Sequence, residues 1–220
     1  MYIVDLYTSP SEKEVVKYIY FSYSEKQRSK ISKAIQTLKE FGISREIPHL
    51  RKISGTKLWE YRILGKDNIR IICVTIINGQ IMVLNIFTKK KQKTSERELN
   101  ISLKRYKTLL DIWHLIRYHE AMLKNKKVIK HTNFDELLAQ ELKNPEFKKE
   151  WDRLEPAYQA QRALIRARID AKMSQRDLAK KAKTTQAVIS RIENMTVSPS
   201  IGLLQKIAEA FGKNLEIKFT

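Results

Sequence analysis

The sequence predicts an α+β protein in which an antiparallel sheet with a helical hairpin comes first and an all-α helix-turn-helix domain follows. The first half contains β-branched and aromatic runs separated by turn signals, which is typical of strands. The segment from Met173 to Gly212 contains short helices separated by capping residues. A polar, basic stretch at 123–133 joins the two parts. At 220 residues the chain is long enough for two small domains, each with its own core.

The chain is strongly basic. Its 43 Lys and Arg against 24 Asp and Glu give a formal charge of +19, which predicts a polyanionic partner such as DNA or RNA, with a merely solubilising surface as the alternative. The single cysteine, Cys73, lies in an apolar run, so no internal disulfide can form and a reducing compartment is indicated. No apolar run approaches the ~20 residues of a membrane span, and no signal peptide is evident. We therefore expect a cytoplasmic protein without membrane contacts.

Hydrophobic periodicity predicts the N-terminal elements. YIVDLY (2–7) is short, β-branched and aromatic, which predicts a strand. From Ser11 to Phe41 the apolar residues recur at helical spacing. Ser24 and Gln27 form a capping box that divides this segment into a helical hairpin, and Gly42 is expected to end the second helix.

Three strands are expected next, at 58–64, 68–77 and 81–89. Asn78-Gly79 separates the last two, and both residues tolerate the positive φ of a tight hairpin. The segment 95–123 contains neither Pro nor Gly and is predicted to be helical. The first part is therefore expected to have the order βααβββα.

The second part is predicted to be helical throughout. The dipeptide Thr132-Asn133 is a suitable cap for the helix that follows it. Pro145 and Pro156 each lie where a helix is expected to start. A further helix over 157–172 is expected to lead into the helix-turn-helix.

The helix-turn-helix itself is predicted from its caps. Ser174 and Asp177 form an N-cap pair that opens a helix ending near Ala182. After a turn at 183–185, a second helix is expected over 186–194. The residues assigned to packing between the two helices are Leu178, Ala179, Val188, Ile189 and Ile192.

The second helix leaves polar side chains on its outward face. Gln can pair with adenine, Arg can pair with guanine, and Ala can touch a thymine methyl group. Other polar groups suit phosphate contacts that fix the docking on DNA. The alternative is a helical hairpin with solvated polar residues. The predicted DNA-contacting residues are Gln175, Thr185, Gln186, Ala187, Ser190, Arg191 and Asn194.

The run MSQRDLAKKAKTTQAVISRIENMTVSPSIGLLQKIAEAFG resembles the Xre/Cro repressor family, and with the upstream PEFKKEWDRLEPAY it is similar to the HigA-type antitoxin branch. The resemblance implies a dimer on operator DNA, since such repressors contact palindromic half-sites about one helical turn apart. Lys183 and Met195 stand where the family usually has glycine. We expect Lys183 to take a left-handed conformation, and the exit from the second helix to differ from the family's.

Cations gather on the predicted strands of the first part. Arg62, Arg70 and the lysine-rich segment 89–93 lie on or just after neighbouring strands. Such a group can hold a phosphate chain and stabilise the charge that develops when a substrate's own 2′-hydroxyl cleaves RNA. A solvated strand end is the alternative.

Other chemistries find no support in the sequence. No Cys/His metal pattern, P-loop, GxSxG motif or paired carboxylate occurs, so neither a metal nor another cofactor is expected. The histidines at 49, 114, 119 and 131 are scattered and are interpreted as structural or solvated.

GTKLWEYRI, the Asn-Ile-Arg strand and FTKKKQKTSERE resemble the RelE superfamily in its phage-derived, HigB-like branch, over most of residues 2–110. The resemblance implies a RelE-like sheet and a ribosome-dependent, metal-independent mRNA endoribonuclease. Ser95 stands where the family usually has proline. The predicted catalytic residues are Arg62, Arg70, Lys89, Lys90, Lys91 and Lys93.

We interpret the two arginines as phosphate and transition-state cations. The lysines are interpreted as RNA-binding groups, with one as a proton shuttle. Trp59, Tyr61 and His49 are further candidates for base stacking or proton transfer, although strand alternation turns Trp59 and Tyr61 away from Arg62 and favours a core position for both.

A toxin followed by its antitoxin matches the HigB–HigA gene order. We therefore expect a toxin domain at 1–121 and an antitoxin at 122–220, with the helix-turn-helix at about 157–212. The partners implied are mRNA on the ribosome, operator DNA, and toxin and antitoxin in mutual contact, with enzymatic activity inhibited in the complex. Two alternatives stay open: a transcription regulator whose N-terminal domain binds without cleaving, and an RNA-binding adaptor.

The segment 134–158 is the most acidic part of the chain and is expected to restrain the toxin. Its acids could cover the cations. Alternatively, its apolar side chains could dock on the helical hairpin and block ribosome entry. These side chains are Leu137, Leu138, Phe147 and Trp151.

Overall fold

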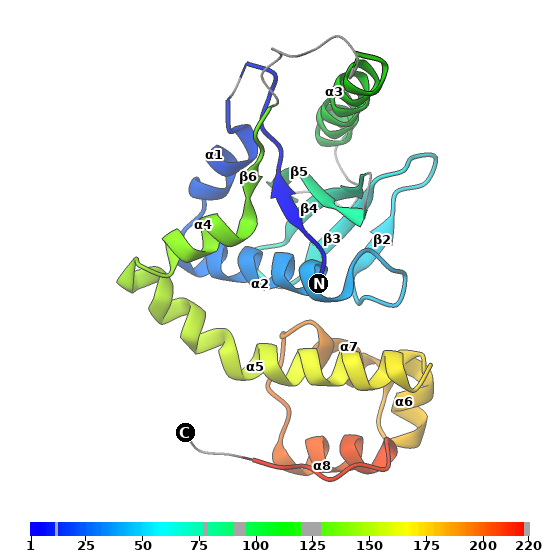
Figure 1. Cartoon of the computed structure of the whole chain (residues 1–220). Coiled ribbons are helices and arrows are strands. Elements are labelled where there is room, and N and C mark those ends of the chain that lie inside the picture. The colour runs from blue at the N-terminus through cyan, green and yellow to red at the C-terminus, as the bar shows by residue number, and fades with distance from the viewer. Residues whose placement is uncertain (12, 77–78, 90–95, 120–128, 218–220) are drawn as a thin grey trace. The chain divides into compact units, whose positions relative to one another are not determined.

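The computed structural model describes residues 1–11, 13–76, 79–89, 96–119 and 129–217 (Figure 1). Contacts divide the chain into two compact units. The first contains residues 1–44 and 49–151, and the second contains residues 45–48 and 152–220. The α+β class is confirmed, because a sheet with helices builds the first unit and helices build the second.

Within the described residues, the first unit contains a six-stranded sheet with strand order β2-β3-β4-β5-β1-β6. β3, β4 and β5 pair antiparallel, as predicted, and β2 adds antiparallel to β3. The antiparallel arrangement expected throughout is wrong at β1, which pairs in parallel with β5. β2 and β6 were not predicted, because strands of three and two residues are too short to show alternation. The strands are β1 (Val4–Leu6), β2 (Leu50–Lys52), β3 (Trp59–Ile63), β4 (Ile69–Thr75), β5 (Ile81–Thr88) and β6 (Thr132–Asn133).

The β4–β5 hairpin has the expected position. Thr75 lies opposite Ile81, and Gly79 has a φ of 75°. Asn78, the other predicted turn residue, lies outside the described residues. Cys73 is buried in β4, and burial raises the pKa of its thiol to about 12, so it is a packing residue in this structure.

The helical hairpin is confirmed as α1 (Val15–Phe21) and α2 (Glu25–Phe41). Ser24 caps α2, and the predicted capping box with Gln27 is present, in which the Ser24 N–H donates to Gln27 Oε1 at 3.2 Å. Gly42 ends α2 with a φ of 76°. The last helix of this part, α3 (Glu96–His119), packs on β5.

The second unit packs α6 (Gln175–Lys181), α7 (Gln186–Glu193) and α8 (Ile201–Ala210) with the C-terminal part of α5 (Pro145–Asp170). The predicted packing residues are confirmed. The core contains Leu164, Leu178, Ala179, Ala182, Ile189, Ile192, Ile207 and Ala210, with Val188 packed against it.

A helix start at Pro156 was predicted wrongly, because α5 runs through this proline without a break. A proline within a helix removes one backbone hydrogen bond and introduces a clash one turn earlier. Trp151 and Tyr158 on either side of it are both buried, so packing outweighs that local cost. The start at Pro145 is confirmed.

None of the helices in the described ranges combines the length and the apolar composition that crossing a membrane would require.

Residues 131–151 belong to the first unit, and we call them the docking segment. β6 pairs antiparallel with β1, placing Thr132 opposite Leu6. The N–H of Thr8 donates to His131 Nδ1 at 3.1 Å. Figure 1 shows β6 lying beside β1 and continuing into α4 (Phe134–Glu141), which Asn133 caps as predicted.

The docking segment also contacts the helical hairpin. Glu141 is buried, and its Oε2 accepts from Arg28 Nε at 2.7 Å and from the hydroxyl of Tyr20 at 3.3 Å. The ammonium of Lys33 lies 3.4 Å from the ring centroid of Trp151. The four apolar residues predicted to dock are all buried, namely Leu137, Leu138, Phe147 and Trp151.

The buried ion pair between Arg28 and Glu141 is expected to stabilise the first unit. Glu141→Ala leaves the Arg28 guanidinium buried without its carboxylate, which typically costs about 3–5 kcal/mol. We expect urea denaturation of the full chain to show a loss of that size in the transition of the first unit. Glu136→Ala on the same helix is the matched control, because its side chain is 68% exposed and 3.9 Å from Lys130. Equal stability of the two variants would show that the Arg28–Glu141 pair contributes nothing.

Candidate nucleic-acid interfaces

The strand register brings Arg62 and Arg70 together. Arg62 on β3 lies directly opposite Arg70 on β4. Side chains two apart on a strand share a face, so Glu60 lies on the same side as Arg62. Glu60 Oε1 lies 2.5 Å from Arg62 Nε and 3.2 Å from Arg70 Nε. One carboxylate therefore holds both guanidinium groups.

The two arginines differ in burial. Arg70 is 5% exposed, and its Nη1 donates to the carbonyl of Ile69 at 2.9 Å. Burial lowers the pKa of Arg70, and the charge of Arg62 acts in the same direction, whereas Glu60 opposes both. The Arg62 side chain is 28% exposed. Arg62 can therefore reach a ligand, while Arg70, beside it on the same face of the sheet, is buried.

Lys89 completes this group, which we call the cationic cradle: Arg62, Arg70 and Lys89. Lys89 follows β5 and is fixed by a double contact with Asn68, whose carbonyl accepts from the Lys89 N–H at 2.9 Å and whose Nδ2 donates to the Lys89 carbonyl at 2.7 Å. Burial lowers the pKa of Lys89, with Glu60 opposing and both arginines adding to the decrease. Lys90, Lys91 and Lys93 lie outside the described residues.

The further candidates fall into two groups. Tyr61 is buried and Trp59 is half-buried, as expected for the face of β3 that turns away from Arg62. His49, by contrast, precedes β2, and burial lowers the pKa of its ring, with the charges of Arg62, Arg51 and Arg70 acting in the same direction. Glu60 was not predicted as part of the site, although its i, i+2 spacing from Arg62 could have indicated it.

The helix-turn-helix keeps left-handed residues where its two usual glycines are missing. Lys183 in the turn has a φ of 51°, as predicted. Met195 after α7 has a φ of 53°, so a residue other than glycine is left-handed at the exit from this helix. Such a conformation costs a non-glycine residue about 1–2 kcal/mol. The packing of α6 against α7 therefore determines the turn.

Several of the predicted DNA-contacting side chains are accessible. Gln186, Ala187 and Arg191 are exposed along α7, and Ser190 is half-buried. Thr185, also exposed, is the N-cap of α7, and its Oγ1 accepts from the Val188 N–H at 3.3 Å. This cap fixes where α7 begins, next to the predicted DNA-contacting residues.

Gln175 and Asn194 are tied into the fold. Gln175 Nε2 donates to Glu193 Oε2 at 2.6 Å, while Gln175 Oε1 accepts from Gln186 Nε2 at 3.3 Å. Asn194 Nδ2 donates to the carbonyl and the hydroxyl of Ser190. Both side chains therefore orient residues of α7.

A buried network that was not predicted holds α7 against α5. Arg168 Nε lies 2.7 Å from Glu193 Oε1, and both side chains are buried. The carbonyl of Glu193 accepts from Gln161 Nε2 at 2.7 Å. This network positions the exposed face of α7.

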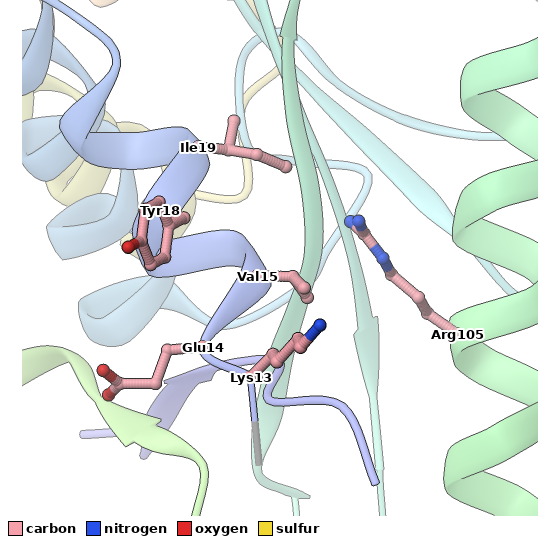
Figure 2. A pocket seen from close by; sticks show the side chains of 6 residues that line it. All are labelled: Lys13, Glu14, Val15, Tyr18, Ile19 and Arg105. Atoms are coloured by element: carbon pink, nitrogen blue, oxygen red, sulfur yellow. The ribbon is translucent and has the colours of Figure 1, made fainter. Parts of the chain in front are cut away.

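A pocket of ≈ 680 Å³ lies apart from the cradle residues. Figure 2 shows side chains at and before α1 on one side of the pocket and Arg105 of α3 on the other; those on the first side are Lys13, Glu14, Val15, Tyr18 and Ile19. Arg105 Nη1 donates to the carbonyl of Leu84 at 2.6 Å and to Asn85 Oδ1 at 3.2 Å, so this cation joins α3 to β5. No group of His, Cys, Asp and Glu suited to a metal ion occurs in the part of the chain that the structure describes.

Comparisons with known proteins identify both parts of the chain. Residues 21–107 match the family described as phage-derived protein Gp49-like (DUF891), and residues 164–218 match a helix-turn-helix family. The chain therefore carries a Gp49-like domain, of the RelE/HigB type of toxin, followed by an Xre/Cro-like helix-turn-helix domain. This arrangement matches a toxin–antitoxin fusion. A search of the curated proteins found no match to the chain.

The left-handed turn residue gives a second prediction. Lys183→Gly should stabilise the second unit by up to about 1 kcal/mol, because glycine adopts a positive φ without the steric cost of a Cβ. Lys180→Gly, which lies within α6, should instead cost about 1 kcal/mol. Both variants lose one positive charge, so thermal unfolding of the pair isolates the backbone effect. A destabilised Lys183→Gly protein would show that the lysine side chain itself holds the turn.

Proposed function

We propose that the chain is a toxin–antitoxin module in one polypeptide, with a toxin at 1–121 and an antitoxin at 122–220. The toxin is a ribosome-dependent, metal-independent mRNA endonuclease. The antitoxin neutralises it in the cytoplasm and represses its own operon. The observation that carries this proposal is the cationic cradle, which lies within the Gp49-like segment.

The cradle suits cleavage of RNA by the substrate's own 2′-hydroxyl. As that oxygen attacks the phosphorus atom, negative charge grows on the phosphate oxygens. Arg62, whose side chain is partly exposed, would bind the phosphate through its planar guanidinium. Arg70 would act by holding Glu60, and Lys89 would bind at the same phosphate. Lys90, Lys91 and Lys93 would extend the contact along the RNA.

Neutralisation would work by blocking the ribosome rather than by covering the cradle. The docking segment contacts β1 and the helical hairpin, whereas the cradle lies on β3, on β4 and after β5. In the sheet, β5 and β1 lie between β4 and β6. Two acids of the docking segment pair with cations of α2 and not with the cradle. Glu141 pairs with Arg28, and Asp135 pairs with Lys39 at 2.5 Å.

The antitoxin would bind operator DNA through α7. Its exposed face carries Gln186 and Arg191, which can read base edges in the major groove. The chain's excess of positive charge would supply the salt-dependent attraction to phosphate. A dimer is expected, because the half-sites of a palindrome each require one such helix.

A second candidate is a transcription regulator whose N-terminal domain binds RNA or a protein partner without cleaving. The burial of Arg70 and its pairing with Glu60 favour this reading, since a cation held that way also stabilises the sheet. Cleavage assays separate the two functions.

The nuclease proposal predicts the behaviour of Arg62→Ala. Residues 1–121 should arrest growth and cut mRNA on ribosomes, while the full chain should be tolerated. Removing a cation that stabilises the transition state should lower cleavage by about 10²–10³-fold. Lys104→Ala, an exposed lysine on α3, is the charge-matched control and should keep activity. Arg70→Ala is a poorer test, because it also leaves Glu60 without one of its buried partners.

An intact growth rate and uncut mRNA on expression of the folded toxin segment would exclude the nuclease and favour the binding-only regulator.

The DNA proposal predicts the behaviour of Arg191→Ala. The full chain should bind a palindrome upstream of its own gene, with affinity that falls steeply as salt rises. Losing a base-reading arginine should cost about 1–3 kcal/mol and relax discrimination at one base position. Lys206→Ala on α8 removes the same charge and should leave discrimination unchanged. Equal affinity of the wild-type chain for operator and scrambled duplexes would exclude specific binding.

A further inference from the structure

His49 has an unusual position beside the cradle. It directly precedes β2, and its carbonyl accepts from the Arg62 N–H at 3.1 Å, so its backbone extends the β2–β3 pairing. Its φ of 59° is left-handed, a conformation that few residues other than glycine adopt. Unfavourable backbone conformations of this kind cluster at functional sites, where the surrounding structure holds a side chain in place.

The ring of His49 carries a nitrogen without a partner. Nε2 is buried, and within the described residues no hydrogen bond satisfies it. Buried polar atoms in folded proteins are nearly always paired, so an unpaired one needs an explanation. A nitrogen that awaits a proton from a substrate is one such explanation.

The charges around His49 come from every strand next to it. Arg51 of β2, Arg62 of β3 and Arg70 of β4 all act on the imidazole. Glu60 is paired with the last two arginines, and Lys89 lies within reach of the same carboxylate. Burial, followed by these three arginines, lowers the pKa of His49 to about 4. The imidazole is therefore neutral at physiological pH and can accept a proton.

We propose that His49 is the general base of the cleavage reaction and that Lys89 is its general acid. This assignment rests on the proposed nuclease function. Nε2 accepts the proton of the 2′-hydroxyl as the 2′-oxygen bonds to phosphorus, forming a 2′,3′-cyclic phosphate. The bond from phosphorus to the 5′-oxygen breaks, and that oxygen takes a proton from Lys89 Nζ. Water then removes the proton from His49 and returns one to Lys89.

Substrate binding should raise the pKa of His49. A phosphate held by Arg62 brings negative charge that offsets the field of the arginines, and an opposite charge nearby favours the protonated imidazole. The pKa of His49 is therefore higher in the complex than in the free protein. The pH profile of kcat reports the pKa of His49 in the complex, and the profile of kcat/KM reports its pKa in the free enzyme. The acid limb of kcat should accordingly lie at higher pH than the acid limb of kcat/KM.

The binding step is tested by NMR titration of the histidine ring protons in the full chain. Saturating trideoxyadenylate, a single strand that lacks the attacking hydroxyl, should raise the pKa of His49 by about 1 or more, the size of shift that a neighbouring opposite charge produces. His131, which Thr8 engages in the docking segment, is the internal control and should not shift. An unchanged His49 titration at saturation would overturn the proposal.

The chemical step is tested with His49→Asn in the full-length Glu141→Ala protein, where the docking segment is loosened. Asparagine tolerates the left-handed backbone but cannot act as the base, so the fold should survive. Ribosome-dependent cleavage should fall by about 10²–10⁴-fold, with loss of the acid limb of the pH profile. If the Glu141→Ala parent cleaves mRNA and His49→Asn cleaves it equally fast, His49 is not the base, although the nuclease function stands. If neither this parent nor residues 1–121 cleave mRNA, the proposed function itself fails; if only residues 1–121 cleave, the same comparison of His49→Asn with its parent is made in that segment.

Discussion

Buried glutamates that hold arginines organise this strongly basic chain. Glu60, Glu141 and Glu193 are each at most 4% exposed, and each is paired with at least one arginine. Removing a carboxylate from water is costly unless a partner and further hydrogen bonds compensate for it. The three pairs lie at the cradle, at the docking segment and behind α7. The positions of the cradle, the docking segment and α7 therefore each depend on one buried glutamate keeping its arginine partner.

The sheet keeps the cationic cradle and the docking segment apart within the first unit. The docking segment adds a short strand at β1, which is a common way for a peptide to bind an open sheet edge. The cradle residues come from β3, β4 and the end of β5, on the other side of β1 in the strand order. A substrate phosphate and the docking segment therefore need not compete for the same residues. His49 lies beside this cradle, and burial, followed by the charges of Arg62, Arg51 and Arg70, lowers the pKa of its ring.

In the second unit, packing compensates for unfavourable local conformations. Lys183 and Met195 both adopt a positive φ although neither is glycine. The core beneath α6 and α7, together with the pair formed by Arg168 and Glu193, holds the two helices in position. The exposed Ala187 and Arg191 of α7 lie outside this core.

The sequence by itself determined the elements whose signals are local. Ser24, Asn133 and Ser174 cap helices as predicted, because a capping residue bonds within three residues of itself. Strand patterns placed Arg62 and Arg70 on neighbouring strands, whereas the register that sets them opposite each other came from the structure. Only the tertiary structure decided the short strands β2 and β6, the unbroken helix through Pro156, and the partners of the buried glutamates. Glu141 and Arg28 are 113 residues apart, and contacts over such separations leave no pattern in the neighbouring residues.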